Sequence, residues 1–120
     1  IDDSIVRGET AKRIVNLIRS GGAKEVHLRV SEMPIKFPCC YGVDFPSFEE
    51  LILGNFQKSN LEAEDFVAKE IGADSMGFVS SEGLKKALGG DENKFCFVCL
   101  SGKYPTEAGC NFLNNKIRKC

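Results

Sequence analysis

The sequence predicts an α/β fold in which the end of a parallel sheet with its helices is followed by a mostly helical carboxy-terminal region. Two features predict the sheet: paired carboxylates before a tight loop, and an alternating strand after a helix and a glycine turn. Two helix-start signals after residue 46 predict the helical region. With 120 residues, 42% of them hydrophobic, the chain suits one compact domain rather than a disordered segment.

Charge and hydropathy exclude several classes of protein. Lys and Arg number 16 against 17 Asp and Glu, whereas domains that neutralise nucleic-acid phosphates carry a marked basic excess. No run approaches the roughly 18 apolar residues of a membrane span. Asp2 and Asp3 stand where a signal peptide has basic residues. We therefore expect a cytoplasmic protein with neither a nucleic-acid nor a membrane partner.

The first region, residues 1–46, contains one helix and one strand. Glycines at 21 and 22 end the predicted helix over 9–20, and residues 26–30 alternate as a strand does. Residues 31–46 hold three of the four prolines and predict a loop. Apolar residues of the helix recur at helical spacing: Ala11, Ile14, Val15 and Ile18.

The second region, residues 47–120, is predicted to be mainly helical. A capping box from Ser47 to Glu50 predicts a short helix over 51–53, and a second box from Ser59 to Glu62 predicts a helix that ends at Gly72. A short strand over 76–79 and a short helix over 82–88 follow, whereas residues 91–120 show no clear pattern. The apolar face of the longer helix is formed by Ala63, Val67 and Ile71.

The amino-terminal loop has the residue types of an anion site. The carboxylates of Asp2 and Asp3 can accept hydrogen bonds from two sugar hydroxyls or hold Mg²⁺ through water. The turn at Gly8 and the helix start behind it present backbone N–H groups to a phosphate. The alternative from the residues alone is an ordinary helix start capped by Asp3 or Ser4.

The whole string resembles a known motif. It is similar to the phosphoribosyl-pyrophosphate (PRPP) loop of type I phosphoribosyltransferases, in the form found in glutamine PRPP amidotransferases. The family has Thr where this chain has Glu9, whose carboxylate we expect to point outward on the first helical turn. By this resemblance the PRPP-binding residues are Asp2, Asp3, Ser4, Ile5, Val6, Arg7, Gly8, Glu9 and Thr10.

The six cysteines include a pair with metal-ligand spacing. Cys96 and Cys99 form a Cys-x-x-Cys pair, and the loop with Cys39 and Cys40 is the nearest source of a further ligand. Spacing alone leaves a metal site, buried free thiols and a disulfide open. Gly102 and Pro105 argue against a helix here, and hence against a thioredoxin-like role.

The segments around these cysteines resemble the same family. Residues 38–44 (Pro-Cys-Cys-Tyr-Gly-Val-Asp44) and 96–105 match cluster-binding segments of its iron–sulfur branch. The resemblance implies Cys39, Cys96 and Cys99 as ligands of a 4Fe–4S cluster, with a fourth ligand upstream of this chain. A cluster in the chain alone is therefore expected to be absent or labile. Cys40 stands where the family commonly has an aromatic residue and ranks second as a ligand, and the resemblance assigns no role to Cys110 or Cys120.

Other polar residues favour structural roles. The only histidine, His27, lies in the strand pattern without a visible partner, and Tyr41 and Tyr104 suit packing around the cysteine loops. Acidic residues of the helix after Ser59 are expected to form a solvated face: Glu62, Glu64, Asp65 and Glu70.

The resemblance extends from Asp2 to about Glu107 and implies a carboxy-terminal piece of such an enzyme. It implies a partial type I phosphoribosyltransferase fold and transfer of glutamine-derived ammonia to PRPP, with Mg²⁺ as cofactor. The implied partners are PRPP, purine nucleotides, a glutaminase domain of the same polypeptide and further copies in a homo-oligomer. We expect no activity from this chain alone. The alternatives are another PRPP-binding transferase or regulator, and a non-catalytic metal-binding module.

Overall fold

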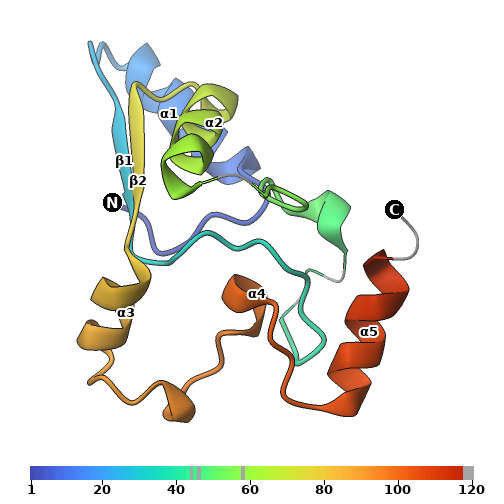
Figure 1. The fold of residues 1–120 in the computed structure, drawn as a ribbon. Coiled ribbons are helices and arrows are strands. Elements are labelled where there is room, and N and C mark those ends of the chain that lie inside the picture. The colour runs from blue at the N-terminus through green and yellow to red at the C-terminus, as the bar shows by residue number, and fades with distance from the viewer. Residues whose placement is uncertain (44, 46, 58, 118–120) are drawn as a thin grey trace.

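A computed structural model describes residues 1–43, 45, 47–57 and 59–117. Asp44, Pro46 and Cys120, which belong to the sequence predictions, lie outside these ranges. Of the described helices, none is long and apolar enough to cross a membrane. The elements, shown in Figure 1, are α1 (Glu9–Ser20), β1 (His27–Val30), the 3₁₀ helix η1 (Phe48–Glu50), α2 (Asn60–Ile71), β2 (Ser75–Phe78), α3 (Ser81–Ala87), the 3₁₀ helix η2 (Glu92–Lys94), α4 (Val98–Ser101) and α5 (Glu107–Ile117).

The two strands form a parallel sheet. Residues His27 to Val30 of β1 pair in register with Ser75 to Phe78 of β2. Asp2 extends the same arrangement on the other side of β1, since its N–H donates to the carbonyl of Arg29 at 2.9 Å and it forms a parallel bridge with Val30. The sheet therefore takes one strand from each of the two predicted regions, 1–46 and 47–120.

One face of the sheet is covered by helices and the other is open. Both α1 and α2 pack together beside the strands (Figure 1), and the outward side chains of His27 and Arg29 are exposed. The side chains of β1 therefore alternate between the helix-covered face and the exposed face, as the two-residue period of a strand requires. The main core contains residues from both helices, both strands and the amino-terminal loop: Ile5, Ala11, Val15, Val26, Val30, Leu53, Ala63, Val67, Ala68, Ile71 and Met76.

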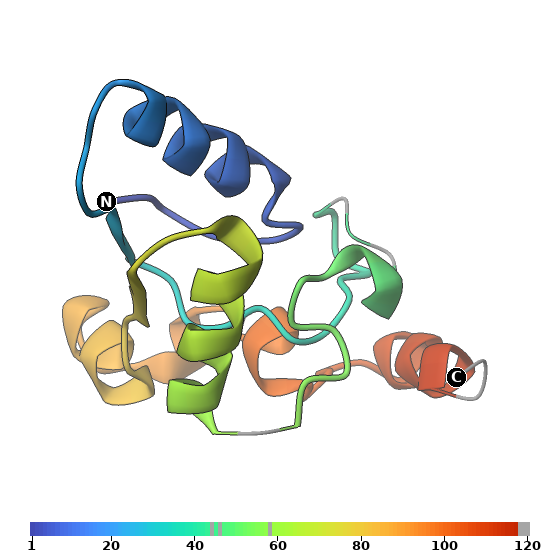
Figure 2. The same cartoon turned by 90° about the horizontal axis from the view of Figure 1, so that it is seen from above.

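The remaining helices lie away from α1. Seen from above, α3, α4 and α5 follow one another along the side of the molecule remote from α1 (Figure 2). A second, smaller apolar cluster joins the loop after β1 to α4 and to the amino-terminal loop. It contains buried Ile35, Cys39, Phe45 and Leu51, with Val6, Cys99 and Leu100 packed against them.

The two longer helices predicted from local start and stop signals, over 9–20 and after Ser59, are confirmed. Helix α1 has the predicted bounds, and its left-handed terminal residue is Gly22 rather than Gly21. The second capping box is present: Ser59 Oγ accepts the Glu62 N–H at 3.3 Å, and the Glu62 carboxylate accepts the Ser59 N–H at 3.1 Å. Gly72 ends α2 in the left-handed conformation.

Three expectations are wrong. The first box does not open a helix over 51–53, because Ser47 makes no cap and Glu50 instead pairs with Arg7; only η1 forms. A single helical turn, α4, does contain Cys99, because Gly102 adopts φ 70° and ends that turn, its N–H donating to Val98 at 2.8 Å. Glu64 is not merely solvated, since it accepts the Phe78 N–H at 2.9 Å and so ties α2 to β2.

Candidate functional site

The amino-terminal loop lines an open pocket beside the sheet. All nine predicted PRPP-binding residues, 2–10, together with Ala11, line this space of about 340 Å³. Asp2 is fixed to β1 at one end, and buried Ile5 joins the main core in the middle. The loop starts at Asp2, which is paired with β1, and continues into the first turn of α1. The sheet thus holds the start of the loop, and the core holds its middle.

The two carboxylates shape the entrance of the loop. One oxygen of Asp2 accepts the Asp3 N–H at 3.0 Å, and one oxygen of Asp3 accepts the Ser4 N–H at 2.7 Å. The hydroxyl of Ser31 reaches the Asp3 carbonyl at 3.4 Å and supports the same turn. Each carboxylate therefore uses one oxygen locally, and a carboxylate has further acceptor positions for sugar hydroxyls or a hydrated cation.

The start of α1 leaves its backbone donors for a ligand. Gly8 precedes the helix with φ 78°, and no side chain caps the first turn. The first N–H groups of a helix have no partner inside it, and together with the helix dipole they favour an anion. The capped-start alternative from the sequence is therefore wrong for Asp3 and Ser4. Glu9 is exposed, as expected for an outward carboxylate, although its residue also borders the pocket.

The loop is supported from below by residues of the segment 48–54, which sequence reasoning missed. The Ile52 N–H donates to the Val6 carbonyl at 2.8 Å, and the Arg7 guanidinium forms an ion pair with Glu50. A Cβ on Gly8 would lie 2.6 Å from Ile52 Cδ1, so only glycine leaves this approach undisturbed. None of these contacts has a local sequence signal, because the partners are more than 40 residues apart.

The cysteine loops meet at the second apolar cluster. The N–H groups of Lys36 and Phe37 both donate to the Cys99 carbonyl at 3.0 Å, which joins the loop after β1 to α4. Cys39 is buried and its sulfur accepts the Tyr41 N–H at 3.3 Å. As expected, a tyrosine packs here: the Tyr104 hydroxyl donates to the Pro38 carbonyl at 2.5 Å.

The predicted cluster ligands differ in exposure. Cys39 is buried, Cys99 is half-buried and Cys96 is exposed. Burial, followed by the neighbouring Cys39, raises the pKa of the Cys99 thiol to about 11. A metal must therefore displace a firmly held proton from this sulfur. Burial likewise raises the pKa of Tyr104, again with cysteines among its neighbours.

The donor set agrees in kind with an iron–sulfur cluster, which is held by cysteine thiolates. Among the residues that the structure describes, no three or more His, Cys, Asp or Glu side chains lie close enough together to hold a metal ion. The roles of Cys39, Cys96 and Cys99 therefore stay a prediction, as does a Mg²⁺ at Asp2 and Asp3. Cys40 and Cys110 are exposed, and the Cys110 sulfur reaches the Tyr104 carbonyl at 3.5 Å.

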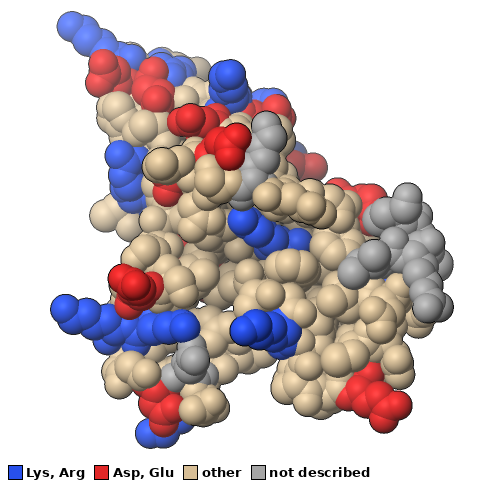
Figure 3. Space-filling model, viewed as in Figure 1, with Lys and Arg blue, Asp and Glu red and all other residues tan. Residues whose placement is uncertain are grey.

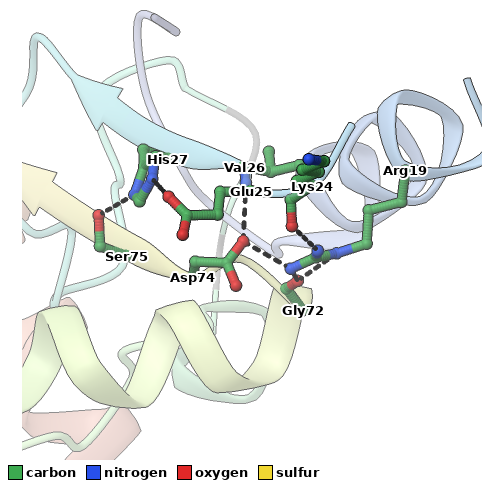
Figure 4. A network of polar contacts seen from close by, with 8 residues as sticks. All are labelled: Arg19, Lys24, Glu25, Val26, His27, Gly72, Asp74 and Ser75. Atoms are coloured by element: carbon green, nitrogen blue, oxygen red, sulfur yellow. Dashed lines mark hydrogen bonds and ion pairs between the residues drawn. The ribbon is translucent and has the colours of Figure 1, made fainter. Parts of the chain in front are cut away.

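A polar network at the amino ends of the strands accounts for the single histidine (Figure 4). Nδ1 of His27 lies 2.9 Å from the Ser75 hydroxyl and Nε2 lies 3.1 Å from the Glu25 carboxylate. Beside it, Asp74 accepts the Val26 N–H, and Arg19 bonds the same carboxylate, each at 2.7 Å. These contacts join the amino ends of the strands to α1 at the protein surface. The pocket lies at the other end of the strands.

The known proteins to which this chain is similar in sequence are named amidophosphoribosyltransferases. No family model matches the chain. It is 50% identical over 107 residues to the amidophosphoribosyltransferase of Methanocaldococcus jannaschii, a match covering 89% of this chain and 21% of that protein. The amidophosphoribosyltransferase of Bacillus subtilis is 46% identical over 111 residues, which cover 89% of this chain and 22% of the relative.

A solved structure shows the same arrangement. The glutamine PRPP amidotransferase from B. subtilis, complexed with ADP and GMP, superposes with a TM-score of 0.71 at 46% identity. The match covers 87% of this chain and 22% of that one. Over the matched residues, this chain is thus homologous in sequence and fold to amidophosphoribosyltransferases, and it spans about one fifth of the length of the curated relatives.

Proposed function

We propose that this chain is the part of an amidophosphoribosyltransferase that holds the ribose 5-phosphate portion of PRPP. The observation that carries the proposal is the uncapped start of α1 at the pocket of residues 2–11, behind two adjacent carboxylates. Amide donors for a phosphate and carboxylates for hydroxyls stand in one loop. This is the recognition that a phosphorylated pentose needs.

The roles of the residues follow from their chemistry. The carboxylates of Asp2 and Asp3 bind the two ribose hydroxyls and orient the sugar. The backbone N–H groups between Gly8 and Thr10 bind the 5′-phosphate. Holding both ends of the sugar fixes C1 for attack by ammonia, which forms the C–N bond as the C1–oxygen bond to pyrophosphate breaks. Mg²⁺ held through Asp2 and Asp3 would offset charge on the departing pyrophosphate.

An iron–sulfur cluster belongs to the same proposal. Cys39, Cys96 and Cys99 would hold it with a fourth ligand from outside this chain. When bound, the cluster would cross-link the loop after β1 to α4. The backbone bonds from Lys36 and Phe37 to Cys99 already join these segments and so support the assignment.

The remaining partners are proposed from the relatives. The B. subtilis enzyme was solved with ADP and GMP, and we propose that purine nucleotides regulate the full-length protein here. That protein would also contain a glutaminase domain that releases ammonia, form a homo-oligomer and reside in the cytoplasm. Its product would be phosphoribosylamine, with glutamate and pyrophosphate released.

A binding experiment tests the loop directly. Ribose 5-phosphate is titrated into the full chain by calorimetry, and Asp3→Asn is compared with Asp65→Asn, which removes an exposed carboxylate of α2. Charged hydrogen bonds to the hydroxyls predict that Asp3→Asn weakens binding by about tenfold or more, whereas Asp65→Asn leaves it unchanged. If the site were only an anion cradle, Asp3→Asn would strengthen binding by removing a negative charge.

The activity itself is tested in the full-length protein. Phosphoribosylamine formation from glutamine and PRPP is measured for the wild type and for Asp3→Asn. We expect the variant to lose this formation while glutamine hydrolysis persists. Normal phosphoribosylamine formation by the variant would contradict the proposed role of the loop.

A further inference from the structure

We infer that Glu50 is a positioning residue for the amino-terminal loop of residues 2–10, called the phosphate loop below. Its ion pair with Arg7 holds this loop in the conformation that binds the ligand and keeps the Arg7 guanidinium from serving as the phosphate ligand. The inference rests on the proposed function, because it concerns how the same pocket is kept ready. It assigns a role to a side chain outside the sequence motif. It also changes the role of Arg7 within the motif from ligand to anchor.

Three consecutive residues of the loop are held by one short segment. Val6 receives the Ile52 N–H at 2.8 Å, Arg7 pairs with Glu50, and Gly8 lies against the Ile52 side chain. These contacts fall immediately before the uncapped start of α1. They therefore fix the direction in which the first amide groups of the helix point.

The supporting segment is itself rigidly placed. Phe48, Leu51 and Leu53 are all buried, with Leu53 in the main core and Leu51 in the second cluster. The turn that joins them is tight: the Gly54 N–H donates to the Leu51 carbonyl at 2.9 Å, and a Cβ on Gly54 would lie 1.9 Å from the Phe48 carbonyl oxygen. A loop tied to this segment inherits its position from two apolar clusters.

The position of Glu50 decides how Arg7 is used. The carboxylate is about one-third exposed and also accepts the Ser47 hydroxyl at 3.4 Å, so it is oriented by its own segment. The ion pair with Glu50 offsets the charge of the Arg7 guanidinium and orients this group toward η1. On the face of the molecule shown in Figure 3, acidic and basic side chains are interspersed. Recognition of the phosphate is then left to the backbone amides.

The test compares Glu50→Ala, Arg7→Ala and the double variant, with Glu49→Ala as the matched control on the same 3₁₀ helix. Ribose 5-phosphate is titrated into each full chain by calorimetry. Both single variants should raise Kd about two- to fivefold, the range that a partly exposed ion pair supports. The double variant should match Arg7→Ala, because removing Glu50 costs nothing further once its ion pair with Arg7 is gone. Glu49→Ala should bind as the wild type does.

The stoichiometry of binding separates positioning from a merely structural role. A variant that only unfolds part of the sample lowers the number of sites and leaves Kd unchanged, whereas a misplaced loop raises Kd at full stoichiometry. In the full-length enzyme, Glu50→Ala should raise the KM for PRPP with little change in glutamine hydrolysis.

The sign of the effect makes the inference refutable. If Arg7 binds the phosphate and Glu50 competes for it, Glu50→Ala will strengthen binding, and the inference is overturned. An unchanged Kd in Glu50→Ala overturns it as well, while the proposed function stands. If the wild-type chain does not bind ribose 5-phosphate, the proposed function fails first and the inference fails with it.

Discussion

Gly8→Ala should destabilise the protein by two separable effects. The first is conformational, because Gly8 has φ 78°, a left-handed conformation that costs a residue with a Cβ about 1–2 kcal/mol. The second is steric, because the new Cβ would lie 2.6 Å from Ile52 Cδ1. That atom ends a flexible side chain, so the contact is relieved by an off-rotamer shift worth about 0.5–1.5 kcal/mol. The total is about 1.5–3.5 kcal/mol.

Gly72→Ala isolates the conformational effect. Gly72 also has φ 78°, but an added Cβ there meets no atom within 4 Å. The free energy of unfolding, measured by urea denaturation, should therefore fall by about 1–2 kcal/mol in Gly72→Ala and by more in Gly8→Ala. The steric part should disappear in a double-mutant cycle with Ile52→Val, which removes Cδ1.

The same pair of variants links stability to the pocket. Gly8→Ala pushes on the loop that lines the pocket and should weaken ribose 5-phosphate binding, whereas Gly72→Ala, whose Cβ would contact no neighbouring atom, should not. Equal losses of stability in the two variants, together with no coupling to Ile52→Val, would refute the steric reasoning. Equal ribose 5-phosphate affinities would show that the approach of Ile52 does not set the loop.

Four further changes have defined outcomes. Ser59→Ala removes a side-chain cap and should lower the free energy of unfolding by about 1 kcal/mol in urea denaturation. Val67→Ala truncates a side chain with no exposed surface and should lower it by about 2–3 kcal/mol. The hydrogen bond from the Val26 N–H is the main reason why the pKa of Asp74 is lowered from 3.8 in the folded protein. The ionised Asp74 carboxylate therefore stabilises the fold above pH 3.8, and this stabilisation is lost as the pH falls through the lowered pKa of the folded state. Asp74→Asn should accordingly make the free energy of unfolding less dependent on pH below about pH 4. Cys39→Ser should lower the iron content per chain of the full-length protein, measured by elemental analysis.

Three of these changes have a control at a matched position. Leu61→Ala truncates a side chain on the exposed face of α2 and should change stability little, so an equal loss would contradict the assignment of Val67 to the core. Asp65→Asn should leave the dependence of stability on pH unaltered. Cys110→Ser should keep the iron content of the wild type. Loss of iron in Cys110→Ser but not in Cys39→Ser would overturn the assignment of the ligands.

Sequence reasoning located elements whose signals are local. The helix α2 was predictable because its cap, its apolar spacing and its terminal glycine lie within a few residues of one another. The segment from Ser47 to Glu50 has the same Ser-x-x-Glu pattern but forms no capping box, because Glu50 pairs instead with Arg7, 43 residues away. A capping box is a competition between a local acceptor and distant ones, and only the fold reveals the distant ones.

The site was partly predictable for the same reason. The loop of residues 2–10 is contiguous, so its pattern could be recognised whole, and the structure gathers all of it around one pocket. Its support by Ile52 and Glu50 could not be predicted, because it depends on where the chain returns after β1. The short helix at Cys99 was missed because Gly102 was interpreted as breaking a helix, whereas a glycine with positive φ ends a turn that has already formed.

The two candidate sites share one packed cluster, and this bears on how they act together. Val6 of the phosphate loop packs in the same apolar cluster as Cys39 and Cys99. Its carbonyl is bonded to Ile52, directly after Leu51 of that cluster. Protein interiors are close-packed, so a change in the spacing of the cysteine loops must be accommodated by the side chains between them and Val6. Whatever fixes the cysteines therefore also limits the positions open to the loop that holds the phosphate.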